Sequence, residues 1–292
     1  MHSKRIPRSF GTHDGSFHAD ETTACSLLLL FDLIDRDQIH RTRDPDVLER
    51  CDFVCDVGGI WDSSIKRFDH HQAEYKGPLS SAGMILLYLK EKGILDPHLY
   101  DHFNKTLIWG VDAHDNGVAK IEPGTSSFSQ IISNFLPIAY DAPHDEMTKA
   151  FFAAVDFAVG HLDRLRKRHY YTIDCRSQVK KTMAGAGQAL LFEESIPWME
   201  NFFDLGGEVH PAQFVIMPSG KHWKLRGIPP SLNERMKVRK PLPEAWAGLH
   251  EEDLKKISGI RGAIFCHKGR FISIWETKED ALAALHKALQ KS

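Results

Sequence analysis

Residues 51–59 read CDFVCDVGG, and their pattern indicates the fold class of the first part of the chain. Its apolar residues form a short run that ends at Asp56, which is the pattern of a buried β-strand that stops at a polar position. Gly58 and Gly59 follow, and glycine lets the backbone come close to whatever binds at the strand end. The stretch therefore predicts a strand whose carboxyl end carries a functional residue.

The same unit of a short strand, a polar loop and a helix recurs along the first half of the chain. Predicted strands cover 9–13, 38–43 and 51–56, and predicted helices cover 20–34, 80–91, 96–109 and 128–140. A further short helix opens at Asp44-Pro45, and residues 144–183 read as one long helix or two in succession. Strands that alternate with helices predict an α/β fold with a mostly parallel sheet and helices on both of its faces.

The length of the chain indicates two domains, because 292 residues are more than one compact core usually holds. The small residues at 184–187 predict the boundary, with a first domain at 1–186, which includes a long connecting helical region, and a second at 187–292. The second part shows short strands mixed with helices, which predicts a smaller α+β domain. Its predicted strands are 189–192, 213–217, 222–227, 262–267 and 271–275, and its predicted helices are 197–205, 251–257 and 278–290.

The composition is that of an ordinary globular protein, with 42% hydrophobic and 26% charged residues and a net charge of -2. No apolar run approaches the length of a membrane span, since the richest one, 27–31, ends at Asp32. We expect no signal or transit peptide and a cytoplasmic protein. The five scattered cysteines suit reduced thiols, and Cys51 and Cys55 lack the second pair that a zinc site needs.

Histidine and aspartate residues of the first domain gather just after apolar runs of the chain, which would converge if these runs are neighbouring strands. They are His13, His18, Asp20, Asp56, His70, His71 and Asp112. Because the carboxyl ends of parallel strands meet at one edge of a sheet, we expect these side chains to converge. They are more ligands than one metal needs, so the pattern predicts two divalent ions that share a bridging carboxylate. Such a pair clamps the oxygens of a phosphoryl transfer and makes hydroxide available from water. Mixed imidazole and carboxylate ligands favour Mn²⁺, with Mg²⁺ as the alternative.

Each of these residues also has a purely structural explanation. Asp20 can cap a helix, Asp56 can belong to a turn, and Asp112 can pair with Asn116. The histidines at 70–71 can lie on a solvated surface turn. The metal hypothesis therefore depends on the residues as a group.

Several short motifs occur in an order that resembles a known family. They read GTHDG and FHADE within 11–21, DVGG at 56–59, FDHHQ at 68–72, LSSAG at 79–83 and GVDA at 110–113. The chain is similar to the melanocyte-proliferating-gene-one family, a branch of the DHH phosphoesterase superfamily. The resemblance continues through 241–249 and 258–267 in the second domain. It implies a DHH-type metal domain and a 3′-to-5′ exonuclease that acts on RNA.

The resemblance also implies roles for single residues. The implied metal ligands are His13, His18, Asp20, Asp56, His70 and Asp112. Asp56 would bridge the two metals, and His71 would face the scissile phosphate, so these two are the predicted catalytic residues. The chain departs from most of the superfamily at His18, where an aspartate is usual, and this exchanges a charged oxygen ligand for a neutral nitrogen.

Two basic stretches favour a phosphate-rich substrate. Residues 221–240 hold seven basic residues and one acid, whereas the basic residues of 161–181 are typical of a solvated helix face. Trp223 and Trp246 near the first stretch suit stacking on unpaired bases. The predicted substrate-binding residues, across a cleft between the domains, are Lys224, Arg226, His267 and Arg270.

These features together predict a metal-dependent phosphoesterase that acts as a 3′-to-5′ exonuclease on single-stranded RNA or short oligonucleotides. Two alternatives stay open: a hydrolase of a small phosphoanhydride or cyclic dinucleotide, and a non-catalytic phosphate or nucleic-acid binder with a retained metal. No membrane partner is expected. The sequence leaves both a monomer and a homo-oligomer open.

Overall fold

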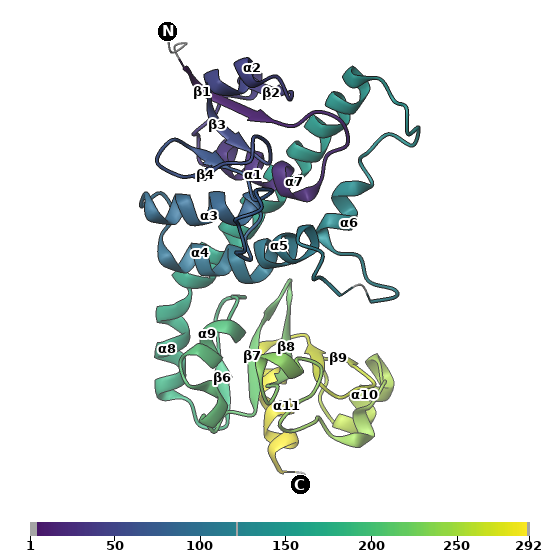
Figure 1. The fold of residues 1–292 in the computed structure, drawn as a ribbon. Helices are drawn as coiled ribbons and strands as arrows, with labels where there is room; N and C mark the ends of the chain where they lie inside the picture. Colours follow the sequence, from purple (N-terminus) through teal and green to yellow (C-terminus); the bar gives the residue numbers. More distant parts are fainter. Residues whose placement is uncertain (1–4, 121, 291–292) are drawn as a thin grey trace. The chain divides into compact units, whose positions relative to one another are not determined.

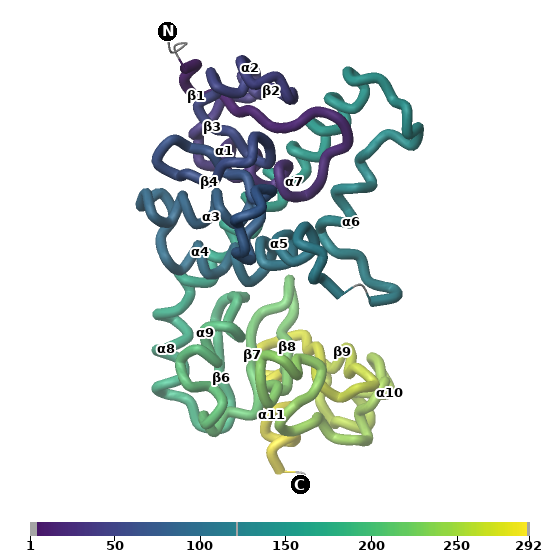
Figure 2. The backbone as a smooth tube through the Cα atoms, viewed as in Figure 1, coloured from purple at the N-terminus to yellow at the C-terminus, as the bar shows by residue number. Residues whose placement is uncertain are grey.

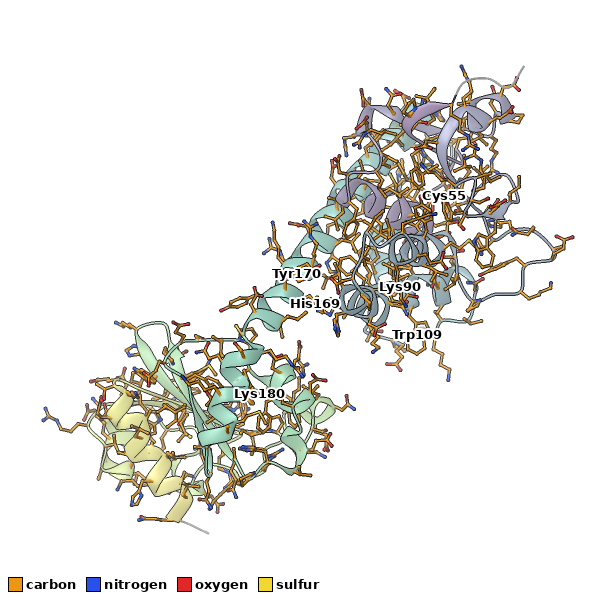
Figure 3. All side chains as sticks on the ribbon, turned by 90° about the vertical axis from the view of Figure 1, so that its left-hand side faces the viewer. Cys55, Lys90, Trp109, His169, Tyr170 and Lys180 are labelled. Atoms are coloured by element: carbon orange, nitrogen blue, oxygen red, sulfur yellow. The ribbon has the colours of Figure 1, made fainter. Side chains whose placement is uncertain are left out.

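The computed structural model of the chain describes residues 5–120 and 122–290. The chain divides between His169 and Tyr170 into two compact units, and both residues lie on α7 (His144–Asp174), as Figure 3 shows. The boundary predicted from the sequence, between residues 186 and 187, lies later, after α8 (Arg176–Gly185). The two positions differ because α8 buries Val179 in a core of the second unit.

The first unit is built on a five-stranded sheet in the order β2-β1-β3-β5-β4 (Figure 1). The strands are β1 (Ile6–Thr12), β2 (Ile39–Arg41), β3 (Cys51–Cys55), β4 (Trp61–Asp62) and β5 (Arg67–Phe68). Neighbours pair in parallel except β4, which runs antiparallel to β5. The β4–β5 pair was not predicted, because strands of two residues are too short to show alternation.

Helices cover both faces of this sheet, which confirms the α/β fold class. The helices of this unit are α1 (Ala19–Leu30), α2 (Pro45–Arg50), α3 (Ser81–Glu91), α4 (Pro97–Phe103), α5 (Trp109–Asp115) and α6 (Phe128–Ser133), together with α7, and of these α1, α2 and α3 contact the strands. Leu48 of α2 packs with Val54 of β3 in a small cluster, whereas Phe53 of the same strand lies in the large core with α1 and α3. Successive side chains of a strand point to opposite faces, so β3 is buried on both.

The helical path from α4 to α5 is longer than predicted. It continues through a π-helical segment (Asn104–Ile108) to Asp115, so the predicted end at residue 108 or 109 is wrong. Leu107 and Val111 are both buried, and their spacing continues the apolar face past Gly110. Asp112 therefore lies inside a helix and not in a loop after a strand.

The second unit, traced in green and yellow in Figure 2, is a smaller α+β domain as predicted. Its sheet has the order β6-β7-β8-β10-β9, with β6 and β7 parallel and the other neighbours antiparallel. The strands are β6 (Ala189–Leu191), β7 (Phe214–Ser219), β8 (His222–Gly227), β9 (Ala263–Cys266) and β10 (Ile272–Trp275), and the helices are α8, α9 (Met199–Asp204), α10 (Glu251–Ser258) and α11 (Lys278–Gln290). None of the helices in the described part of the chain combines the length and the apolar character that crossing a membrane requires.

Candidate metal centre

The loops after β1, β3 and β5, together with the start of α1 and the end of α5, bring three groups of metal-ligating side chains together in the first unit. In each group the ligand atoms lie within 4.8 Å of one another. The groups are His13 with His18, Glu21 and Asp56, then Asp56 with His70 and His71, and then Asp20 with His70 and Asp115. Asp56 belongs to the first two groups and His70 to the last two, so the groups form one continuous cluster.

His13 lies between two carboxylates in the first group. Its Nε2 atom is 3.1 Å from Glu21 Oε1 and 3.3 Å from Asp56 Oδ2. Burial opposes the charge on His13, but hydrogen bonding to the Asp56 and Glu21 carboxylates outweighs burial and raises the pKa of His13 to about 10.

His70 lies among three carboxylates. Its Nε2 atom is 2.9 Å from Asp115 Oδ2, 3.7 Å from Asp56 Oδ1 and 3.8 Å from Asp20 Oδ2. Asp115 and then Asp56 raise the pKa of His70 to about 10, against the effect of burial. Burial together with the charges of Asp56 and Asp115 raises the pKa of Asp20 well above its ordinary value. The cluster thus holds more negative charge than its own side chains neutralise.

Two buried oxygens of the cluster, Glu21 Oε2 and Asp56 Oδ1, make no hydrogen bond with the described residues. The nearest nitrogens to Asp56 Oδ1 among the ion pairs are His71 Nδ1 at 3.4 Å and His70 Nε2 at 3.7 Å, and His70 Nε2 is itself closer to Asp115. Buried polar atoms are nearly always paired, so unpaired atoms that face one another need an explanation. A divalent cation provides one, because it takes lone pairs from several ligands at once. The mixed nitrogen and oxygen donors suit a metal such as Mn²⁺, and the shared Asp56 suits two ions. The residues therefore fit a pair of divalent cations.

Two features of the backbone and its neighbours hold the centre of the cluster in place. Asp56 has a φ of 58°, a left-handed conformation that is uncommon for a residue other than glycine and occurs often at functional sites. Asp69 is buried and accepts a hydrogen bond from the backbone of Gly59. Its other oxygen lies 2.8 Å from His71 Nδ1. The His71 ring is therefore fixed at one nitrogen while 63% of its side chain remains exposed.

Asp112 lies outside these groups, although the sequence predicted it as a metal ligand. Its Oδ1 atom accepts hydrogen bonds from Ser80 N, Ser80 Oγ and Gly83 N, at 3.0, 2.8 and 3.1 Å. Burial raises the pKa of Asp112 to about 6. Asp115, which follows one helical turn later, is the carboxylate that α5 places beside His70. Asp20 both supports the fold and belongs to the cluster, because it accepts hydrogen bonds from the start of α3 and is a member of the third ligand group.

Glu21 and Asp115 are the two members of the cluster that the sequence did not single out as ligands. Glu21 Oε1 accepts a hydrogen bond of 2.9 Å from the backbone of His18, so this side chain folds back toward the loop. It brings a carboxylate to the ligand group that also contains His18. Glu21 could have been recognised from the sequence, because a glutamate in the first turn of a helix can reach back to the residue before the helix. Asp115 could have been recognised because it directly precedes the Asn116-Gly117 turn.

An open pocket of about 910 Å³ gives access to the cluster. Its lining residues include His13, His18, Asp56, His71, Asp115 and Arg43. A pocket of this size accommodates a nucleotide-sized group next to the metal ligands.

The predicted substrate-binding residues of the second unit lie at β8 and around the β9–β10 turn. Arg226 pairs with Ile272 across β8 and β10, and His267 N donates to Ile272 O at 3.0 Å from the other side. Residues opposite one another on antiparallel strands share a face, so Arg226, Ile272 and His267 form a row across the sheet. Lys224, two residues before Arg226, lies on the same face. Arg270 lies in the turn itself, with a φ of 56°.

Lys224 and Arg226 are cations without an acidic partner within ion-pair distance in the described part of the chain. Burial and the mutual repulsion of the two charges lower the pKa of Lys224, while burial and the charge of Arg235 lower that of Arg226. Arg226 Nε is buried and makes no hydrogen bond there. In contrast, Arg239 donates to the carbonyl oxygens of Gly207, His210 and Ala212 and is committed to the fold. Within this basic stretch, Lys224 and Arg226 are the pair suited to an anion.

The prediction that Trp246 stacks on bases is wrong. Only 2% of this residue is exposed, and its ring packs edge-on against Trp275 in the core. Trp223 also packs against that core. The aromatic rings beside the basic face are instead those of Phe265 and Phe271, whose centroids lie 6.2 and 4.4 Å from that of His267.

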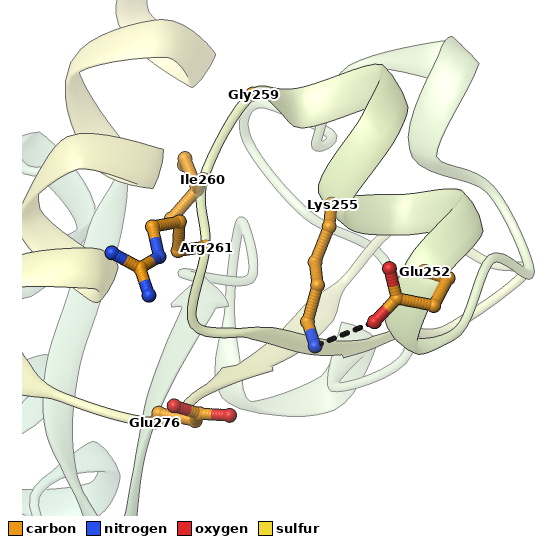
Figure 4. A pocket seen from close by; sticks show the side chains of 6 residues that line it. All are labelled: Glu252, Lys255, Gly259, Ile260, Arg261 and Glu276. Carbon is orange, nitrogen blue, oxygen red and sulfur yellow. Dashed lines mark hydrogen bonds and ion pairs between the residues drawn. The ribbon is translucent and has the colours of Figure 1, made fainter.

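A separate pocket of about 630 Å³ in the second unit is shown in Figure 4. Its lining carries both signs of charge, and Lys255 Nζ is paired with Glu252 at 2.9 Å. None of the residues that line it in the described structure was predicted to bind substrate.

Comparison with known proteins gives one consistent family. The model of the family MYG1_exonuc, described as an uncharacterised protein family (UPF0160), matches residues 9–289. The MYG1 protein of Chlamydia pneumoniae is 51% identical over 98% of both chains, and the MYG1 exonuclease of Homo sapiens is 31% identical over 97% of this chain and 86% of its own. RecJ of Thermus thermophilus in complex with Mn²⁺ aligns over 97% of this chain and 52% of its own, with a TM-score of 0.31 and 15% identity. The chain therefore belongs to the MYG1 family, the melanocyte-proliferating-gene-one family that its motifs resemble.

Proposed function

We propose that this chain is a metal-dependent exonuclease that hydrolyses phosphodiester bonds of single-stranded RNA or short oligonucleotides from the 3′ end. The observation that carries the proposal is the Asp56 carboxylate, which is shared by two groups of ligand atoms and has a buried Oδ1 that makes no hydrogen bond with the described residues. Relatives from Homo sapiens and Rattus norvegicus that are both 31% identical to this chain are named MYG1 exonuclease, which supports the same activity.

Two ligand sets follow from the distances in the cluster. His13, His18, Glu21 and Asp56 would hold one cation. The group of Asp20, His70 and Asp115 would hold the other together with Asp56, whose Oδ1 lies 3.7 Å from His70 Nε2, so that Asp56 would bridge the two. When bound, two divalent cations stabilise the charge of a phosphoryl group and lower the pKa of water that attacks it.

His71 has the geometry of a proton donor to the leaving oxygen. Its Nδ1 atom is held by the buried Asp69 carboxylate, which fixes the direction of the ring. Its side chain is exposed in the pocket that contains Asp56, so the other nitrogen is accessible to substrate. Asp69 thereby acts as the positioning residue for His71.

The basic face of the second unit would bind phosphates of the substrate chain. Gly269 N donates to His267 Nδ1 at 2.9 Å, so the neutral ring carries its proton on Nε2 and can donate it to a phosphate oxygen. Arg226 has a buried Nε that lacks an acceptor in the described structure, and a phosphate supplies one. Lys224 and Arg270 add positive charge to the same face and its turn.

The test is hydrolysis of end-labelled single-stranded RNA, the matched DNA, a dinucleotide and pyrophosphate, with Mn²⁺, with Mg²⁺ and with chelator. Asp56→Asn is compared with Asp145→Asn, an exposed aspartate at the start of α7. A ladder from the 3′ end of RNA that needs metal and disappears only in Asp56→Asn is the expected result. Cleavage confined to the dinucleotide or pyrophosphate would show that the substrate is a small molecule and not an RNA chain. Metal binding without turnover of any of these substrates would show that the protein is a binding protein and not an enzyme.

A further inference from the structure

Arg43 is the single lysine or arginine among the described residues that line the pocket of the metal cluster. It follows β2 closely at the carboxyl edge of the sheet, where Thr12 of β1 is paired with Arg41. The backbone N–H of Thr42 continues this pairing and donates to Thr12 O at 2.8 Å. Arg43 therefore leaves the sheet beside the segment that carries His13.

The side chain of Arg43 is available to a ligand. It is 65% exposed, and within the described residues its ion pair is with Asp14, at 3.3 Å, whose side chain is itself 41% exposed. Exposed ion pairs of this kind contribute only about 0–1 kcal/mol, so a phosphate can replace Asp14 at little cost. Arg41 provides the contrast, because it is buried, donates to Gly15 O and packs over the ring of Phe151.

The charge of the pocket gives Arg43 a specific task. Metal ions at the cluster neutralise the phosphate that is cleaved, but a neighbouring phosphate of the same chain enters a lining that also holds Asp14 and Asp69. A guanidinium matches a phosphate with two parallel hydrogen bonds. We propose that Arg43 binds the phosphate next to the scissile one and thereby makes the site prefer nucleotide chains over isolated phosphodiesters. This inference rests on the proposed nuclease function.

The experiment compares two substrates in Arg43→Ala: a short single-stranded RNA, and bis(p-nitrophenyl) phosphate, which has one phosphodiester and no flanking phosphate. For RNA, KM is expected to rise about tenfold, and the salt dependence of RNA binding to weaken by about one unit of slope. For bis(p-nitrophenyl) phosphate, kcat/KM stays within about twofold of wild type, since that substrate offers Arg43 no second phosphate. Arg43→Lys keeps the positive charge but lacks the two parallel N–H donors of the guanidinium. Its KM for RNA is expected to lie between that of wild type and that of Arg43→Ala.

The matched control is Arg36→Ala, since Arg36 is an exposed arginine of the same unit that pairs with Asp156 and does not line the pocket. It is expected to match wild type on both substrates. Equal losses of Arg43→Ala on both substrates would overturn the inference, because Arg43 would then act on the cluster itself. Wild-type kinetics on RNA would overturn it as well, while leaving the proposed function intact. A wild-type protein that cleaves neither substrate would instead remove the proposed function, and this inference with it.

Discussion

Gly83 is the position where a single methyl group is expected to disturb the support of the metal cluster most directly. It is the third residue of α3, and its backbone N–H donates to Asp112. A Cβ atom added at Gly83 would lie 2.5 and 2.6 Å from the two carboxylate oxygens of Asp112. These distances are far below van der Waals contact, so Gly83→Ala must displace the carboxylate.

The net effect on stability follows from two opposing contributions. Alanine is better than glycine inside a helix by up to about 1 kcal/mol. Against this, a displaced Asp112 loses hydrogen bonds from Gly83 N and from Ser80, each worth about 1.5–3 kcal/mol to a charged group. Asp112 is only 3% exposed, so water does not readily replace these donors. Loss of two of the three bonds, less about 1 kcal/mol of helix propensity, predicts a destabilisation of about 2–5 kcal/mol.

The measurement is urea denaturation of the metal-free protein, followed by circular dichroism. Gly160→Ala is the matched control, because Gly160 lies exposed in the middle of α7 and an added Cβ meets nothing within 4 Å. This control is expected to gain about 0.5–1 kcal/mol from helix propensity and reduced freedom of the unfolded chain. If Gly83→Ala is as stable as wild type while Gly160→Ala gains stability, the close contact with Asp112 does not exist in solution and the reasoning fails.

Three other predictions concern the site. His71→Ala is expected to lower kcat about 100-fold or more and to leave bound Mn²⁺ unchanged in elemental analysis; metal lost together with activity would make His71 a ligand. Arg226→Ala is expected to raise KM for RNA more than it lowers kcat, and unchanged values of both would remove Arg226 from the substrate site. In the metal-free protein, the pKa values of His13 and His70 are both raised to about 10. Each protonated histidine therefore stabilises the fold fully below its ordinary pKa of 6.5, and this stabilisation is lost as the pH rises through about 10. Urea denaturation across that range, with chelator and with saturating Mn²⁺, should show the larger loss of stability with chelator, and equal slopes would contradict it.

The α/β class, the small α+β domain and the family could all be predicted from the sequence. These features are local: an apolar run that ends at Asp56, the proline at the start of α2 or α4, and the short strands of the second unit can each be recognised from a few neighbouring residues. The motifs are also short continuous strings, so their order was readable without any knowledge of contacts. The α4–α5 path was misjudged for the same local reason, since Gly110 looks like a helix end when its packing is unknown.

Which side chains of a motif face the cluster could not be predicted from the sequence, because it depends on how the helices and strands pack. Asp112 and Asp115 are one helical turn apart, and the packing of α5 turns Asp115 toward His70 and Asp112 toward Ser80. The structure likewise buried Trp246 and put Arg226 and His267 in one row, through pairings of strands that are distant in sequence. Local patterns specify where helices and strands form, whereas the direction of a side chain at a site depends on contacts between elements, and those contacts exist only once the chain has folded.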